Sequence, residues 1–229
     1  MVHSEFIACL SQLFSDNANE TLGVKMSKYM KNKFPFYGIP SPVRLELSNK
    51  AINNAPISTY TELIDTVRLC FNLNEREWQY TGIFLLLKYK KLWMNNHMNP
   101  FFEELVLTKS WWDTVDTLSS NCIGLYLKKN PKAKDNVLEQ WFYSNNMWLN
   151  RVVIIHQLTY KEDVDTDLLK QCAMHFSPSK EFFIQKAIGW ALRQYAKYNP
   201  DWVLALVNSI ELKPLSKREA TKHLKLQIH

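Results

Sequence analysis

Glycine is scarce in this chain of 229 residues, which contains five: Gly23, Gly38, Gly82, Gly124 and Gly189. They lie too far apart to form a Gly-x-Gly-x-x-Gly or Walker-type phosphate loop, and the Asn-Gly and Asp-Gly pairs of tight hairpins are absent. A glycine-poor chain rich in Leu, Lys, Glu and Trp is typical of an all-helical protein. The scarcity therefore excludes the common nucleotide-binding loops and favours helices.

Metal-ligand spacing is also absent from the sequence. The four cysteines (Cys9, Cys70, Cys122 and Cys172) form no Cys-x-x-Cys pair, and the six histidines are scattered. Zinc and iron–sulfur sites require ligands at short, regular spacings. We therefore expect no metal site and four reduced, mostly buried thiols.

No apolar run is long enough to span a bilayer, and the N-terminal Met-Val-His-Ser-Glu-Phe lacks the basic and apolar regions of a signal peptide. These absences favour a soluble protein of the cytoplasm, without a membrane partner.

Positive charge is in excess. Lys and Arg number 28 against 22 Asp and Glu, which gives a net charge of +6. Such a balance favours a polyanionic partner, either nucleic acid or an acidic membrane surface. Because 46% of the residues are hydrophobic and 13% are aromatic, the chain can also bury a substantial core.

The apolar residues recur at spacings of three and four, the period of amphipathic helices. Possible capping boxes begin helices at Asn74 with Glu77, at Ser110 with Asp113 and at Ser216 with Glu219. The predicted helices cover residues 3–14, 20–32, 42–53, 58–71, 75–91, 99–106, 111–128, 133–144, 147–160, 165–176, 181–198, 200–211 and 216–226.

A longer period runs through these helices. Trp78, Trp112, Trp148 and Phe183 each open a long helix after a polar residue, at spacings of 34, 36 and 35 residues. Repeated two-helix units of this length are typical of α-solenoids, and the tetratricopeptide consensus is missing. We predict an all-α, HEAT-like repeat α-solenoid in which residues 1–229 form one domain with a basic concave face.

Equivalent repeat positions hold cations. Arg151 follows Trp148 by three residues, and Lys186 follows Phe183 by three. Trp190 and Arg193 continue the face of Lys186 at helical spacing. Repetition would align cations and aromatic rings along one surface, as a groove that follows a nucleic-acid backbone requires.

The densest cluster of candidate functional residues is Ser110-Trp111-Trp112-Asp113-Thr114-Val115-Asp116. Asp116 lies four residues after Trp112, so both side chains share one helix face. A carboxylate beside aromatic faces can stabilise the oxocarbenium-like sugar of N-glycosidic bond hydrolysis, with Trp190 adding a second ring. Arg151 could bind a phosphate.

Structural alternatives remain open for each of these residues. Paired tryptophans commonly pack in a core, with Trp111 the one expected to face inward. Asp113 suits the start of a helix. Arg151 and Lys186 could be solvated surface charges.

The chain resembles the AlkD-type DNA glycosylases of the DNA alkylation repair family. The resemblance covers nearly the full length, through Tyr29-Met30-Lys31-Asn32, Phe36-Tyr37-Gly38-Ile39, Lys109 to Asp116, Trp148-Leu149-Asn150-Arg151, Ser179 to Trp190 and Pro214 to Ala220.

The resemblance implies a HEAT-like solenoid that wraps duplex DNA and excises cationic alkylated purines, such as 3-methyladenine and 7-methylguanine, without metal or cofactor. It implies that Asp116 is the catalytic carboxylate and that Trp112 and Trp190 pack against the deoxyribose of the lesion. It also implies that Arg151 contacts a phosphate. The remaining expected DNA contacts are Lys186, Arg193, Tyr29, Lys31 and Ser41. We expect a monomer in the cytoplasm, associated with the nucleoid if the source is bacterial.

One segment departs from the family pattern. The usual polar-Thr-Pro-x-Arg-Arg reads Pro40-Ser41-Pro42-Val43-Arg44-Leu45 here, so a proline and a leucine replace a polar residue and an arginine. The departure leaves open a relative that binds DNA without excision. A HEAT-type protein scaffold is the third hypothesis.

Overall fold

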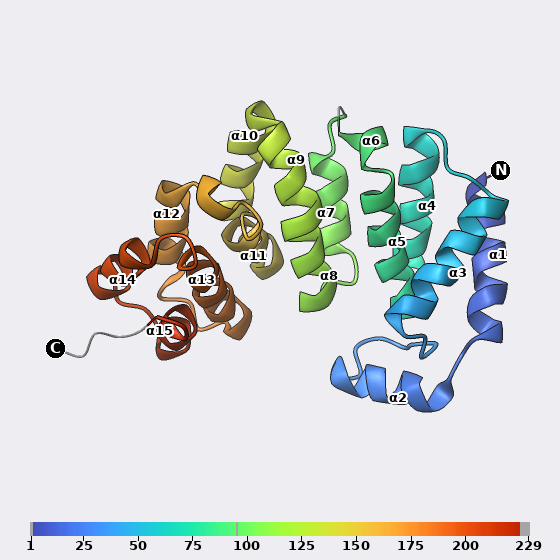
Figure 1. The fold of residues 1–229 in the computed structure, drawn as a ribbon, viewed down its shortest axis with the longest axis horizontal. Helices are drawn as coiled ribbons and strands as arrows, with labels where there is room; N and C mark the ends of the chain where they lie inside the picture. Colours follow the sequence, from blue (N-terminus) through green and yellow to red (C-terminus); the bar gives the residue numbers. More distant parts are fainter. Residues whose placement is uncertain (1, 95, 225–229) are drawn as a thin grey trace. The chain divides into compact units, whose positions relative to one another are not determined.

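A computed structural model of the chain describes residues 2–94 and 96–224, drawn in Figure 1. Within these residues the secondary structure consists of helices joined by turns, without a strand, so the all-α prediction is confirmed. The helices pack into two compact units, Met1–Lys109 and Ser110–His229. The single domain over residues 1–229 stays a prediction.

The first unit is built around helices that pair with their neighbours in the chain. Its helices are α1 (Val2–Asp16), α2 (Glu20–Tyr29), α3 (Ser41–Asn54), α4 (Tyr60–Asn72), α5 (Arg76–Lys88), α6 (Lys90–Trp93) and α7 (Asn99–Leu107). Helix α4 packs against α5, and α1 packs against both α3 and α4. The start of α4 is fixed by a capping box between Thr59 and Glu62, which the sequence analysis missed.

The second unit is also built from helices that pack against their neighbours in the chain. Its elements are α8 (Trp112–Thr117), a π-helix η1 (Leu118–Ile123), α9 (Gly124–Lys129), α10 (Pro131–Phe142), α11 (Met147–Ile155), a 3-10 turn η2 (Lys161–Asp163), α12 (Thr166–Phe176), α13 (Phe182–Tyr195), α14 (Pro200–Ser209) and α15 (Pro214–Thr221). Helix α13 packs against both α11 and α15, so it lies at the centre of this unit.

Several predicted helices end earlier than expected. The helix predicted over 20–32 stops at Tyr29, because Lys31 and Asn32 adopt left-handed φ angles of 58° and 55°. The one predicted over 75–91 breaks at Tyr89 into α5 and α6. The helix predicted over 216–226 runs from Pro214 to Thr221, and residues 225–226 lie outside the described part of the chain.

Two of the three capping boxes predicted from the sequence, at Asn74 and at Ser216, are wrong. Asp113 of the third lies in the first turn of α8. Helices α5, α8 and α15 begin after Glu75, Trp111 and Lys213, and none of these three N-cap side chains makes a capping hydrogen bond. Glu77 and Glu219, the acidic residues of the boxes at Asn74 and Ser216, make tertiary contacts instead. Glu77 is the clearest case in the first unit.

Glu77 holds the segment that leads into α3. Its carboxylate accepts hydrogen bonds from the backbone N–H groups of Tyr37, Gly38 and Ile39, at 3.2, 2.9 and 3.1 Å. The residue is 1% exposed. Gly38 has a φ of 83°, a conformation that favours glycine, which lets three successive N–H groups converge on one carboxylate. Burial raises the pKa of Glu77, and the three N–H groups act in the opposite direction.

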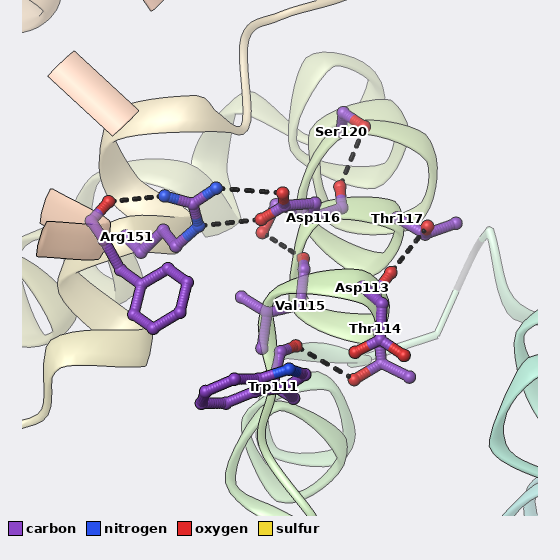
Figure 2. Close-up of polar contacts among 10 residues, drawn as sticks. Trp111, Asp113, Thr114, Val115, Asp116, Thr117, Ser120 and Arg151 are labelled. Carbon is purple, nitrogen blue, oxygen red and sulfur yellow. Dashed lines mark hydrogen bonds and ion pairs between the residues drawn. The ribbon is translucent and has the colours of Figure 1, made fainter. Parts of the chain in front are cut away.

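The helix predicted over 111–128 contains a π-helical segment. Helix α8 runs without a break into η1 and then into α9. The hydroxyls of Ser119 and Ser120 donate to the carbonyl oxygens of Val115 and Asp116, at 2.6 and 2.9 Å. Figure 2 shows the Ser120 contact. One turn of wider helix therefore follows Asp116 directly, a feature often found near functional sites.

None of the helices in the described residues is both long and apolar enough to cross a membrane.

Candidate functional site

The second unit contains an open pocket of about 260 Å³. Its lining residues are Trp112, Asp116, Arg151, Phe182, Phe183, Lys186, Trp190, Arg193 and Glu219. The pocket thus brings together, from α8, α11 and α13, all six residues that the sequence analysis placed on this surface. Phe182, Phe183 and Glu219 are the additional members.

Helix α8 supplies the aromatic and acidic pair. Trp112 is its first residue and Asp116 follows one turn later, so both side chains reach the pocket from the same helix face. Trp190, on α13, contributes a second indole ring to the lining. All three residues are partly exposed, so they can be reached from solvent.

Asp116 is bound to Arg151 through both carboxylate oxygens (Figure 2). Nε and Nη2 of Arg151 donate to Oδ1 and Oδ2 of Asp116, at 2.7 and 2.9 Å. Nη1 of Arg151 donates to the carbonyl oxygen of Phe183. The side chains of Arg151 and Asp116 are 5% and 15% exposed. The guanidinium is therefore held on two sides and fixes the plane of the carboxylate.

The environment of Asp116 has opposing effects on its ionisation. Burial raises the pKa of the Asp116 carboxyl, while the hydrogen bonds and the charge of Arg151 lower it. Asp113, earlier on the same helix, adds a smaller effect that raises the pKa.

Arg151 does not lie where a solvated surface charge would lie. It is 4% exposed, and its guanidinium forms an ion pair with Asp116. The alternative of a solvated arginine is therefore wrong, because the guanidinium is the counter-ion of a mostly buried acid. Its binding of a DNA phosphate stays a prediction.

A second ion-pair cluster lies in the same pocket. Oε1 of Glu219 accepts from Nζ of Lys186 at 2.9 Å, and Oε2 accepts from Nη1 of Arg193. The two cations lower the pKa of Glu219 to about 2, so its carboxylate is ionised at neutral pH. Glu219 was not among the predicted site residues, because Ser216 and Glu219 matched the pattern of a capping box.

Trp111 belongs to an aromatic cluster beside the pocket. Its ring lies edge-on to Trp148 and Phe183, with centroid distances of 5.9 and 5.1 Å. It does not line the pocket, which agrees with its expected inward packing.

The other predicted DNA contacts belong to the first unit. Tyr29 ends α2 and is 69% exposed, and Lys31 is exposed in the following turn. Ser41, the first residue of α3, is exposed and accepts a hydrogen bond from Arg44 at 3.3 Å. Arg44 itself is buried against the ring of Tyr80. Binding of DNA by Tyr29, Lys31 and Ser41 stays a prediction.

Within the part of the chain that the structure describes, no group of three His, Cys, Asp or Glu side chains could hold a metal ion. Cys70, Cys122 and Cys172 are buried and unbonded to one another, and burial raises the pKa of each thiol. The expected state of these cysteines, as reduced and buried thiols, agrees with this placement.

A larger hollow, of about 860 Å³, lies between α10 and α12. It contains no residue predicted to act on DNA. Two of its charged groups, Lys134 and Asp165, pair with each other at 2.7 Å. The smaller pocket is therefore the better candidate for a reaction site.

Comparisons with known proteins define first a class and then a family. The chain superposes on a solved structure titled "Predicted DNA alkylation repair enzyme from Enterococcus faecalis", with a TM-score of 0.84 and 35% sequence identity, over 91% of this chain and 97% of that one. The predicted fold class, an all-α protein of the α-solenoid type, is confirmed.

The sequence model of the DNA alkylation repair enzyme family matches residues 10–224, and the chain belongs to that family. No curated protein matches the chain. The resemblance predicted from the sequence is therefore confirmed, and a role in DNA repair follows from it.

Proposed function

We propose that the protein is a monofunctional DNA glycosylase. It hydrolyses the N-glycosidic bond of cationic alkylated purines, such as 3-methyladenine and 7-methylguanine, in duplex DNA, and so initiates base excision repair. The observation that supports this most directly is the open pocket that holds Trp112, Asp116 and Trp190 together. Membership of the DNA alkylation repair family supports it independently.

The reaction needs little acid catalysis. Alkylation at N3 or N7 gives the purine a positive charge, so the bond between the base nitrogen and C1′ can break with its electron pair going to the base. The base leaves as a neutral molecule, and C1′ becomes an oxocarbenium-like cation. Water then adds to C1′ and loses a proton, which leaves an abasic sugar. The protein must therefore stabilise one positive charge and admit one water molecule.

Asp116 is suited to stabilise that charge. Its carboxylate lines the pocket and is held in one orientation by Arg151. A carboxylate oxygen can accept more than one hydrogen bond, so pairing with Arg151 leaves acceptor capacity for the attacking water. Partial burial strengthens the attraction between the carboxylate and a cationic sugar, because fewer water molecules screen it.

Trp112 and Trp190 would border the sugar on the pocket side. The face of an indole ring is the most favourable aromatic surface for a cation. Lys186, Arg193, Tyr29, Lys31 and Ser41 would bind the DNA backbone. The main role of Arg151 would be to hold Asp116. It could bind a phosphate only through N–H groups that do not already donate to Asp116 or Phe183. The protein would act as a monomer in the cytoplasm.

The test uses duplex DNA that contains a single 7-methylguanine. The wild-type protein should release the free base, which chromatography detects, and Asp116→Asn should slow release about 10²- to 10³-fold, the usual effect of losing one preorganised electrostatic group. Asp113→Asn is the matched control, because it makes the same chemical change on the same helix outside the pocket lining. Equal release by the two variants would contradict the role of Asp116.

A second candidate, a binder of damaged DNA without excision, is favoured by one observation. Both oxygens of Asp116 are already bonded to Arg151, in a side chain that is 15% exposed. In that case the wild-type protein would bind the modified duplex in a salt-dependent manner and release no base.

A further inference from the structure

Glu219 occupies an unexpected position for an acidic residue on a surface proposed to bind DNA. Its carboxylate lines the pocket beside Lys186 and Arg193, and its side chain is 15% exposed against 38% and 22% for the two cations. An acid in such a place would ordinarily repel a phosphate. Its contacts instead connect the two cations to each other through one carboxylate.

The backbone fixes the place of Glu219. Helix α15 lies against α13, and at Gly189 an added Cβ would meet the Cβ of Glu219 and the carbonyl oxygen of Ser216. Oγ of Ser216 also donates to the carbonyl oxygen of Gln185 at 3.0 Å. Because the two helices approach this closely, the side chain of Glu219 extends from α15 to Lys186 and Arg193 on α13.

Lys186 and Arg193 keep donors for a ligand. The ammonium of Lys186 has three N–H groups, and the guanidinium of Arg193 has five. The contacts to Glu219 use only part of this capacity. The three side chains together retain one net positive charge, which faces the pocket.

We propose that Glu219 is a positioning residue, which holds Lys186 and Arg193 together as a preorganised pair for one phosphate of the DNA backbone. This inference rests on the proposed function. Long cationic side chains lose rotamer freedom when they bind a phosphate, and the contacts to Glu219 impose that order before DNA arrives. The benefit of order exceeds the loss of one unit of positive charge.

The proposal predicts the opposite sign from simple charge counting. Removing a negative charge from a DNA-binding protein ordinarily tightens binding. Glu219→Gln should instead weaken binding at least about fivefold, because both cations become free to move. Glu211→Gln is the matched control, because it removes the same charge from an exposed residue that precedes α15 and does not line the pocket.

The measurement is fluorescence anisotropy with a duplex that contains one tetrahydrofuran abasic-site analogue, repeated at several salt concentrations. The logarithmic salt dependence of the dissociation constant should also become shallower for Glu219→Gln, because a phosphate contact is lost. Binding by Glu219→Gln that equals or exceeds that of Glu211→Gln would overturn the proposal and leave the proposed function intact. Absence of binding by the wild-type protein would overturn both.

Two further variants separate positioning from a general effect on the fold. Glu219→Asp keeps the charge but is one methylene shorter, so it should also weaken binding, and wild-type affinity would count against the proposal. In a Lys186→Gln/Arg193→Gln background, Glu219→Gln should weaken binding no further. An undiminished effect in that background would mean that Glu219 acts through the fold, and the proposal would be wrong.

Discussion

The first unit buries the carboxylate of Glu77 against three backbone N–H groups, whereas the second unit buries the carboxylate of Asp116 against the guanidinium of Arg151. Burial raises the pKa of both acids. Glu77 is 1% exposed and is surrounded by the chain, while Asp116 lines an open pocket beside Trp112 and Trp190.

The comparison shows that a perturbed pKa does not by itself distinguish a functional carboxylate from a structural one. All three hydrogen bonds to Glu77 come from one short segment, which it fixes in place. Asp116 is held by Arg151, whose positive charge favours the ionised carboxylate, and Asp116 lines a pocket that is open to a ligand. Solvent access and hydrogen-bond partners therefore distinguish the structural carboxylate of Glu77 from the candidate functional carboxylate of Asp116.

The largest effect is expected from breaking the pair in the second unit. Arg151→Met should lower the free energy of unfolding by about 3–5 kcal/mol, because it leaves a mostly buried carboxylate without its counter-ion. Urea unfolding followed by circular dichroism measures this change. Asp116→Asn combined with Arg151→Met should recover part of the loss. A cost for Arg151→Met of less than about 1 kcal/mol, the range of exposed pairs, would mean that Asp116 is as well solvated as a surface acid.

The next largest effect is expected at acidic pH. His156, in the second unit, is 0% exposed, and burial lowers its pKa to about 4. The unfolded chain therefore takes up a proton first as the pH falls, so stability is complete above about pH 6.5 and declines towards pH 4, by about 3 kcal/mol. Glu77 and Asp116 behave in the opposite sense, because a raised pKa in the folded state favours folding as they become protonated.

The check is the free energy of unfolding measured from pH 7 to pH 4, for the wild-type protein and for His156→Phe. The variant should lose the decline in stability towards pH 4 that His156 causes, since a phenyl ring does not titrate. An unchanged dependence on pH in His156→Phe would assign the acid sensitivity to other groups.

The smallest effect is expected at Glu77. Glu77→Gln should lower the free energy of unfolding by about 1–3 kcal/mol. The amide has one oxygen in place of two, so it cannot accept all three backbone hydrogen bonds as the carboxylate does. The rate of base release at saturating DNA should stay within about twofold of wild type, since Glu77 lies outside the pocket. A rate loss as large as that of Asp116→Asn would remove the distinction between the two acids.

The sequence was sufficient to predict the helical fold and six of the nine residues that line the pocket. Trp112 and Asp116 are one turn apart on a single helix, so their shared face followed from helical geometry. Lys186, Trp190 and Arg193 were predicted together for the same reason. Local spacing on a helix is fixed by backbone geometry, which the sequence pattern reports directly.

Long-range pairing was not predictable in this way. Arg151 binds an acid 35 positions earlier, and Glu219 binds cations 33 and 26 positions earlier. Glu77 and Glu219 both stood in apparent capping boxes, and the local pattern concealed their tertiary contacts. Which partner a charged side chain finds depends on how helices approach one another, and no spacing rule encodes that approach.

The π-helical segment after Asp116 determines how α8 and α9 are rotated relative to each other about their common axis. Arg151 of α11 pairs with Asp116 on one side of the segment, and on the other side the backbone of Gly124 lies against the carbonyl of His156, which ends α11. Both ends are thus matched to the same neighbouring helix. Deleting one residue from the segment would turn the two ends by about 100° relative to each other, so either the carboxylate or the glycine would lose its partner. An insertion or a deletion between Leu118 and Ile123 should therefore disrupt one of these two contacts.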